Sequence, residues 1–149
     1  MTRSNRPKRL TPPEPPGALL KRFDGFPARA RKAEQAAHDP AYLEMVRQLP
    51  CLYCGVEPCG EAAHLKMASA AFGKPLRFGK KPEDRWALPL CRDDHQNALH
   101  AQHRQAEAAF WEALGINPLL VAAKLYAQRG DLVAMRAVVM VAIAERGKK

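Results

Sequence analysis

The sequence predicts a single α+β domain that is mainly helical, and three observations carry this prediction. The chain has 149 residues, which is a usual size for one domain. Hydrophobic residues make up 47% and charged residues 26%, an ordinary balance for a globular protein. Helical patterns surround two short segments that have the character of strands. We therefore expect an arm over residues 1–25 and one domain over residues 26–149.

The first 32 residues carry most of the net charge, because nine Lys or Arg against two acidic residues account for +7 of the total +9. Six of the thirteen prolines lie within residues 1–27. Such a segment cannot bury enough apolar surface to offset the entropy lost on ordering, so we expect a flexible basic arm. A cationic arm suits phosphate binding without reading of base sequence, and the alternative is a solubilising tail. The arm residues expected to bind nucleic acid are Arg3, Arg6, Lys8 and Arg9.

Helical segments are expected over residues 26–48, between Cys91 and Gly115, over residues 118–129 and over residues 131–146. The first is broken at Asp39-Pro40, because the residue before a proline disfavours the helical conformation. Two short strands are expected in between, at Glu61–Met67 and at residues 85–90. Residues 68–84 connect them and are basic with Gly and Pro, as is typical of a loop.

The last helix is apolar over most of its circumference, with Arg136 as the only charge between Leu132 and Ala144. A helix with so wide an apolar face is either buried centrally or shared with a partner subunit. We expect it to lie in the core, because a small domain needs apolar area. A homodimer formed through this helix is the alternative.

No run of about 18 apolar residues occurs, so we expect no membrane span. The basic N-terminal residues are not followed by the apolar stretch of a secretory signal. We therefore expect a cytosolic protein, in which four cysteines indicate a metal before they indicate disulfides.

The strongest local motif is Cys51-Leu-Tyr-Cys54-Gly. Two thiolates separated by two residues on a tight turn can both face one zinc ion at about 2.3 Å. This pair is half of a site, and Cys91 is the obvious supplier of a third ligand. Three residues remain open as the fourth ligand, namely Asp94, His95 and Cys59. The alternative is that the cysteines are small core residues.

The phrases CLYCG, AAHLKM, DRWALPLCRDDH and QH occur in this order over residues 49–127. This pattern resembles the HNH nuclease superfamily, and in particular small phage and prophage HNH proteins that continue into a phrase such as FWEALGINP. The resemblance implies a zinc-stabilised ββα-metal core with flanking helices. It also implies a metal-dependent DNA endonuclease or nickase in the cytoplasm of a bacterium or a phage-infected host, with DNA and a recombination or packaging protein as partners.

The resemblance assigns roles to three histidines. His64 matches the general base that takes a proton from water, and His95 and His103 match ligands of a catalytic Mg²⁺ or Mn²⁺. The middle Asn of the family is absent, because Trp86 stands near its position and Asp84 is the nearby substitute. Ala63 stands where many relatives carry a further metal ligand.

In one continuous helix His95 and His103 would be roughly 12 Å apart, too far to share an ion. Their pairing therefore predicts a loop between them, and His100 is the substitute if the helix is continuous. Beside such a site we expect Lys66, Lys80 and Lys81 to contact phosphates, unless they belong to a solvated loop. The alternative function is a non-catalytic zinc-binding module for nucleic acid or a protein partner.

Overall fold

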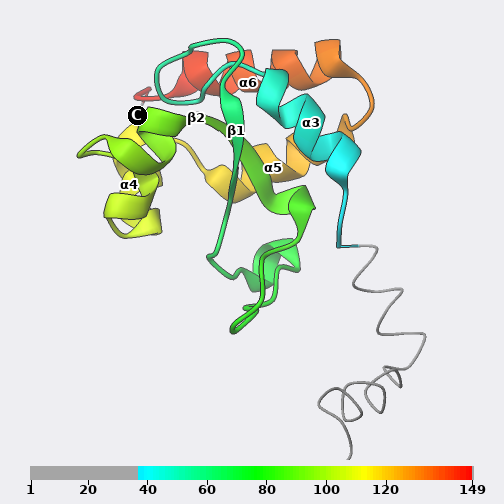
Figure 1. Ribbon diagram of the computed structural model, residues 1–149, viewed down its shortest axis with the longest axis vertical. Coiled ribbons are helices and arrows are strands. Elements are labelled where there is room, and N and C mark those ends of the chain that lie inside the picture. Colours follow the sequence, from blue (N-terminus) through cyan, green and yellow to red (C-terminus); the bar gives the residue numbers. More distant parts are fainter. Residues whose placement is uncertain (1–36, 149) are drawn as a thin grey trace, which may run out of the picture. The chain divides into compact units, whose positions relative to one another are not determined.

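The structure is a computed structural model that describes residues 37–148 (Figure 1). This part of the chain is α+β and mainly helical, as predicted, with one two-stranded sheet and helices around it. The predicted arm, with Arg3, Arg6, Lys8 and Arg9, and the helical pattern of residues 26–36 lie outside the described residues.

The sheet consists of β1 (Gly60–His64) and β2 (Ala87–Cys91), which pair antiparallel with Gly60 opposite Cys91 and His64 opposite Ala87. β1 is shorter than the predicted segment that ended at Met67. The reason is that the backbone N–H groups of Lys66 and Met67 donate to the Glu107 carboxylate instead of a neighbouring strand. This register places His64 at one end of the sheet and Cys91 at the other.

Within residues 37–148 four α-helices accompany the sheet, and their bounds are α3 (Pro40–Gln48), α4 (Glu107–Leu114), α5 (Pro118–Ala127) and α6 (Leu132–Glu145). Side-chain caps begin three of them, because Asp39, Asn117 and Asp131 each accept a hydrogen bond from a backbone N–H of the first turn. The cap at Asp131 places the start of α6 within the segment 131–146 that was expected to be helical. α4 ends at Gly115, which has a φ of 74° that glycine adopts without strain.

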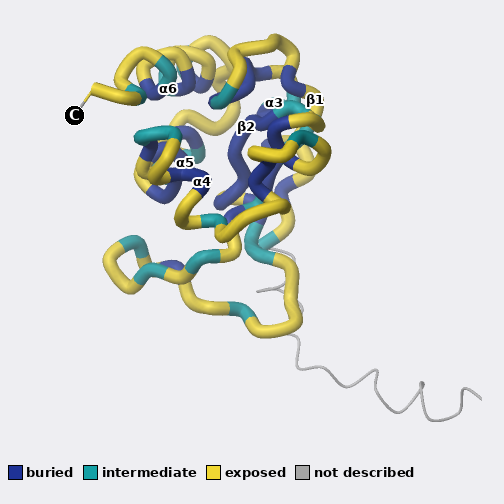
Figure 2. Tube along the Cα trace, turned by 90° about the vertical axis from the view of Figure 1, so that its left-hand side faces the viewer, coloured by how far each residue is buried: buried dark blue, intermediate teal, exposed yellow. Residues whose placement is uncertain are grey.

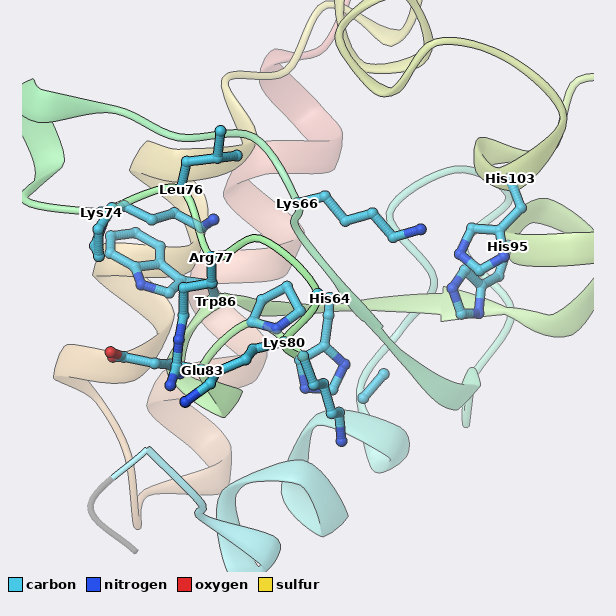
Figure 3. A pocket seen from close by; sticks show the side chains of 15 residues that line it. His64, Lys66, Lys74, Leu76, Arg77, Lys80, Glu83, Trp86, His95 and His103 are labelled. Atoms are coloured by element: carbon cyan, nitrogen blue, oxygen red, sulfur yellow. The ribbon is translucent and has the colours of Figure 1, made fainter. Parts of the chain in front are cut away.

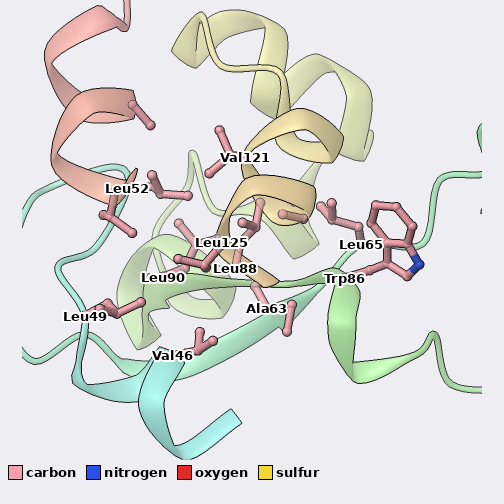
Figure 4. Close-up of a cluster of buried hydrophobic side chains, with 14 of the residues drawn as sticks. Val46, Leu49, Leu52, Ala63, Leu65, Trp86, Leu88, Leu90, Val121 and Leu125 are labelled. Atoms are coloured by element: carbon pink, nitrogen blue, oxygen red, sulfur yellow. The ribbon is translucent and has the colours of Figure 1, made fainter. Parts of the chain in front are cut away.

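The hydrophobic core lies around β2, between α3 and α5 (Figure 4). Residues from both sides of the strand are fully buried, including Leu88 and Leu90 of β2, Val46 of α3 and Leu125 of α5. In Figure 2 β2 is accordingly buried along most of its length, whereas the segment between the two strands is largely exposed. The core therefore fixes both ends of β2, where the candidate site residues lie.

α6 packs on α5 along one stripe, in which Met135, Val139 and Ala142 are buried. The expectation of a centrally buried helix is wrong, because Val133 is 81% exposed and Val141 is 52% exposed. α6 lies at the outside of the fold, and no element of residues 37–148 covers its outer side. Among these same residues no single helix meets the length and hydropathy of a membrane span; only α4 and α5 taken together do so, with an 81° bend between them.

Candidate metal centre and histidine pocket

Three cysteines and one aspartate form a cluster of metal-ligating groups, and the ligand atoms of Cys51, Cys54, Cys91 and Asp94 all lie within 4.8 Å of one another. The sulfurs of Cys54 and Cys91 are 3.7 Å apart. Two sulfurs bound tetrahedrally to one zinc ion at about 2.3 Å each are separated by roughly 3.7–3.8 Å. The Asp94 Oδ2 atom lies 3.2 Å from Cys51 Sγ and 2.9 Å from Cys91 Sγ. These four residues could therefore bind a metal such as zinc.

Two tight backbone features bring the ligands together. Cys51 and Cys54 lie on a turn in which the Gly55 N–H donates to the Cys51 carbonyl at 2.9 Å, with a φ of 79° at Gly55. Cys91 is the last residue of β2, and Asp94 follows in the helical segment Asp93–Asn97. The Cys91 N–H donates to Cys51 Sγ at 3.3 Å, which joins the two halves of the cluster.

The three thiols of this cluster are held in their protonated form at neutral pH. Burial, and hydrogen bonding to Asp94, raise the pKa of the Cys51, Cys54 and Cys91 thiols to about 11. Burial alone would raise the pKa of Asp94 as well, but hydrogen bonds from the thiols and from His100 lower it. Four acidic groups this close can all be anionic only if a positive ion compensates them.

His100 belongs to the surroundings of this cluster. Its Nε2 atom lies 2.7 Å from Asp94 Oδ1, and its ring stacks on Tyr53 with the centroids 4.3 Å apart. The structure thus places His100 on the carboxylate of a candidate metal ligand and not beside His103, where it was the substitute. A residue that holds a ligand in this way fixes the ligand's orientation and is missed by a search for ligand spacing alone.

The other two candidates for the fourth ligand lie elsewhere. Cys59 is 6% exposed, and its Sγ atom contacts the carbonyl oxygens of Val46 at 3.4 Å and Glu61 at 3.2 Å. It is therefore a core residue. His95 Nδ1 lies 2.7 Å from Glu61 Oε2, away from the cysteines. Asp94 is the candidate that the structure brings to the three cysteines.

His64, the last residue of β1, is paired with a buried carboxylate. Its Nε2 atom lies 2.8 Å from Oδ1 of Asp84, whose side chain is 1% exposed. Asp84 Oδ2 accepts a hydrogen bond from the Asp39 N–H at 2.9 Å and lies 2.8 Å from His38 Nδ1. The sequence indicates Asp84 only as the substitute for the missing Asn, and it indicates no role for His38. No local motif relates His38 to a residue 46 positions away.

The charges of this pair suit proton acceptance by His64. Burial alone would raise the pKa of Asp84, but hydrogen bonds from His38, His64 and the Asp39 N–H lower it to about 2, so the carboxylate is ionised. Burial lowers the pKa of His64, and the hydrogen bond to Asp84 opposes this only in part. At neutral pH we therefore infer a neutral imidazole that donates from Nε2 to Asp84 and has a free electron pair on Nδ1.

His95 and His103 lie together, with their ring centroids 4.3 Å apart. The chain does not continue as one helix between them, since the helical segment ends at Asn97 and a short turn follows at Gln102–Arg104. The structure thus contains the loop that this pairing requires. Burial and the neighbouring His95 and Lys66 lower the pKa of His103, which favours its neutral, metal-binding form.

One pocket of about 520 Å³ unites these groups (Figure 3). His64, His95 and His103 line it, and Figure 3 shows the Lys66 side chain extending toward the latter two. The remaining basic residues of the lining are Lys74, Arg77, Lys80 and Lys81. Within residues 37–148 only the cysteine cluster gathers three or more candidate metal ligands, so His95 and His103 form a pair without a third close ligand of this kind.

The fold and these sites define a class: a small α+β domain with a Cys₃Asp cluster at one end of a two-stranded sheet and a basic pocket lined by His64, His95 and His103. Residues 13–125 match the family described as "Protein of unknown function (DUF968)", and the chain belongs to this family. No curated protein matches the chain, and no solved structure does so.

Proposed function

We propose that this protein is a metal-dependent DNA endonuclease or nickase of the HNH type, which hydrolyses phosphodiester bonds. The observation that carries the proposal is that His64, which is hydrogen-bonded to Asp84, lines one basic pocket together with the His95–His103 pair. A base and a pair of metal ligands facing a cationic cavity suit the hydrolysis of a phosphate ester. The order of two strands and a following helical segment agrees with the ββα-metal core of that superfamily.

His64 acts as the general base in this proposal. Its Nδ1 atom accepts a proton from the attacking water, and the ionised Asp84 on Nε2 stabilises the imidazolium that forms. Asp84 is a positioning residue, because it holds the tautomer and the orientation of the ring without touching the substrate. This is the role that the missing Asn has in the family that the sequence resembles.

His95 and His103 would hold the catalytic Mg²⁺ or Mn²⁺. The contact between His95 Nδ1 and Glu61 leaves Nε2 of His95 free, and such a partner is typical of metal-binding imidazoles. Magnesium and manganese commonly keep waters and bind substrate phosphates, so oxygen atoms of water and substrate would have to complete the coordination of an ion on these two imidazoles. When bound, the ion would supply charge that stabilises the leaving 3′ oxygen.

The remaining components have supporting roles. Zinc held by Cys51, Cys54, Cys91 and Asp94 would tie the 51–54 turn to the end of β2 and to the segment that carries His95. Lys66, Lys80 and Lys81 on the pocket wall would contact substrate phosphates. These contacts carry no sequence information, so we expect cleavage with little sequence preference.

The test is cleavage of supercoiled plasmid with added Mg²⁺ or Mn²⁺. We expect His95→Ala and His103→Ala to lose activity, with partial recovery in excess Mn²⁺, because each removes one ligand. His100→Ala is the matched control, since its ring lies at the cysteine cluster and not beside His103. Provided that zinc content is retained, it should cleave at a near-normal rate. An inactive His100→Ala variant with normal zinc content would contradict the assignment of the ion to His95 and His103.

The second candidate is a non-catalytic zinc-binding module that contacts nucleic acid or a protein. One observation favours it, namely that no third metal ligand joins His95 and His103 within residues 37–148. Ala63 stands at the position where many proteins of the HNH superfamily carry a further metal ligand. If plasmid, branched and single-stranded DNA all stay intact with every divalent ion while DNA binding persists, this candidate replaces the enzyme.

A further inference from the structure

The segment of residues 66–82 connects the two strands and extends away from the helices (Figure 1). It contains five Lys or Arg and no acidic residue. Phe78 lies within it and is 86% exposed, and Leu76 is 53% exposed. Phe78 and Leu76 thus form a small exposed apolar surface among cationic side chains, and such a surface is available to a binding partner.

This segment has a fixed base. The backbones of Ser69 and Lys74 exchange two hydrogen bonds of 2.9 Å, which close a turn over Ala70–Phe72. Lys74 is buried, and its Nζ atom donates to the Met67 carbonyl at 2.5 Å. The Glu107 carboxylate accepts from the Met67 N–H at 2.8 Å. These contacts hold the first part of the segment against the domain, and Phe78 follows it in an exposed turn.

The same segment forms a wall of the histidine pocket. Leu76, Arg77 and Lys80 flank Phe78 in sequence and line the pocket that His64 also lines. Phe78 itself is not among the residues that line this pocket, so a ligand held by Arg77 and Lys80 at the pocket would reach Phe78 at its outer edge. Cationic and apolar side chains are mixed along residues 74–81, which suits a ligand that has both phosphates and flat apolar faces.

We propose that residues 66–82 bind unpaired nucleotides, with a base stacked on Phe78 and the adjoining phosphates held by Arg77 and Lys80. The proposal rests on the proposed function and specifies its substrate class: DNA with a single-stranded portion, such as a flap or a gap. Proteins that bind single strands combine cationic grooves with aromatic side chains in this way. Insertion of Phe78 into an intact duplex would first have to unstack a base step, which costs a few kcal/mol. An unpaired base avoids this cost.

A protein partner is the less favoured occupant. The interior of protein–protein interfaces is depleted in lysine, whereas this segment has three lysines within residues 74–81 and no acidic residue to balance them. The polyanionic backbone of DNA complements that charge.

The test is a binding measurement on the whole chain, loaded with zinc and without added Mg²⁺ or Mn²⁺. The probes are one oligonucleotide containing 2-aminopurine as a single strand, as a flap and as a full duplex. Stacking on one aromatic side chain contributes about 1–3 kcal/mol per base, so Phe78→Ala should weaken binding of the single strand and the flap roughly 5- to 150-fold. Phe78→Trp should retain binding and the quenching of 2-aminopurine. Val133→Ala, which removes an apolar side chain that is 81% exposed on α6, is the matched control and should change nothing.

Equal loss of affinity for the duplex and the single strand, or no loss for either, would overturn the proposal. If single-strand binding stays unchanged in Phe78→Ala but binding of a protein partner is lost, the segment is a protein-docking surface. The binding measurement needs no cleavage, so the two proposals can fail separately. If Phe78→Ala loses single-strand binding but the wild-type chain never cuts DNA, the proposed hydrolysis is refuted and this inference stands. If Phe78→Ala loses single-strand binding and the wild-type chain cuts DNA, both are supported.

Discussion

Replacing Asp84 with Asn removes the charge that lies between His38 and His64. The pKa of Asp84 is about 2 in the folded chain against 3.8 for the unperturbed carboxyl. At about 1.4 kcal/mol per pH unit, this difference stabilises the folded state by about 2 kcal/mol at neutral pH. Because the folded pKa is the lower one, the stabilisation is present above pH ~4 and is lost as the pH falls toward 2. The Asp84→Asn variant should lack it at every pH.

On the proposed function, the same substitution should change the pH dependence of cleavage. If His64 is the base, it must be neutral, so the rate should rise with pH through a midpoint below 6.5, since burial lowers the pKa of His64. The Asp84 carboxylate favours the imidazolium, and its loss should lower that pKa further. In the Asp84→Asn variant the acidic limb of the rate profile should therefore lie at lower pH than in the wild type.

Urea denaturation at pH 7 measures the stability difference, and an NMR titration of the His64 ring measures its pKa directly. Glu44→Gln is the matched control, because it makes the same carboxylate-to-amide change at an exposed ion pair with Arg47 and should shift stability by less than about 0.5 kcal/mol. Both variants should keep their zinc content. A loss below about 0.5 kcal/mol in Asp84→Asn, with an unchanged His64 titration, would refute the reasoning.

Two further predictions concern the metal and the arm. The purified chain should carry about one zinc per molecule and should lose its cooperative thermal transition when a chelator removes the metal, because structural zinc supplies folding energy. Asp94→Ala should weaken zinc binding, whereas Cys59→Ala should retain it. Loss of zinc in Cys59→Ala alone would contradict the assigned ligands. Deleting residues 1–22 removes six Lys or Arg and one Glu, so nonspecific DNA affinity should fall and its salt dependence should become shallower; an unchanged salt slope would show that the arm does not contact phosphate.

Short sequence signals predict several of the helix ends. The proline after Asp39, the cap at Asp131 and the glycine after Leu114 each act on their own helix end, so the sequence alone located these boundaries. The sequence does not predict the position of α6, because an apolar composition shows what a helix could bury and not what is available to cover it. Only three of its residues are buried within the described part of the chain.

The candidate sites likewise contain contacts that local spacing predicts and contacts that it does not predict. The Cys51–Cys54 pair is local and its spacing predicts a shared metal, and Asp94 repeats this spacing from Cys91. The bond between Asp84 and His38 joins residues far apart in the sequence, and so does the stacking of His100 on Tyr53. Such contacts follow from the packing of whole elements, so no spacing pattern could predict them.

The central claim is that His64 is the base of a hydrolase, and two histidines on one carboxylate allow a direct test. His64 and His38 both lie 2.8 Å from Asp84, but His64 lines the large pocket with His95 and His103, whereas the His38 side chain is 66% exposed and lies outside that pocket. The measurement is the rate of Mn²⁺-dependent cleavage of plasmid and flap DNA by His64→Ala and His38→Ala. We predict a loss on the order of 10²–10⁴-fold for His64→Ala, with zinc content and DNA binding retained, and a change of only a few-fold for His38→Ala. Equal rates for the two variants would contradict the claim.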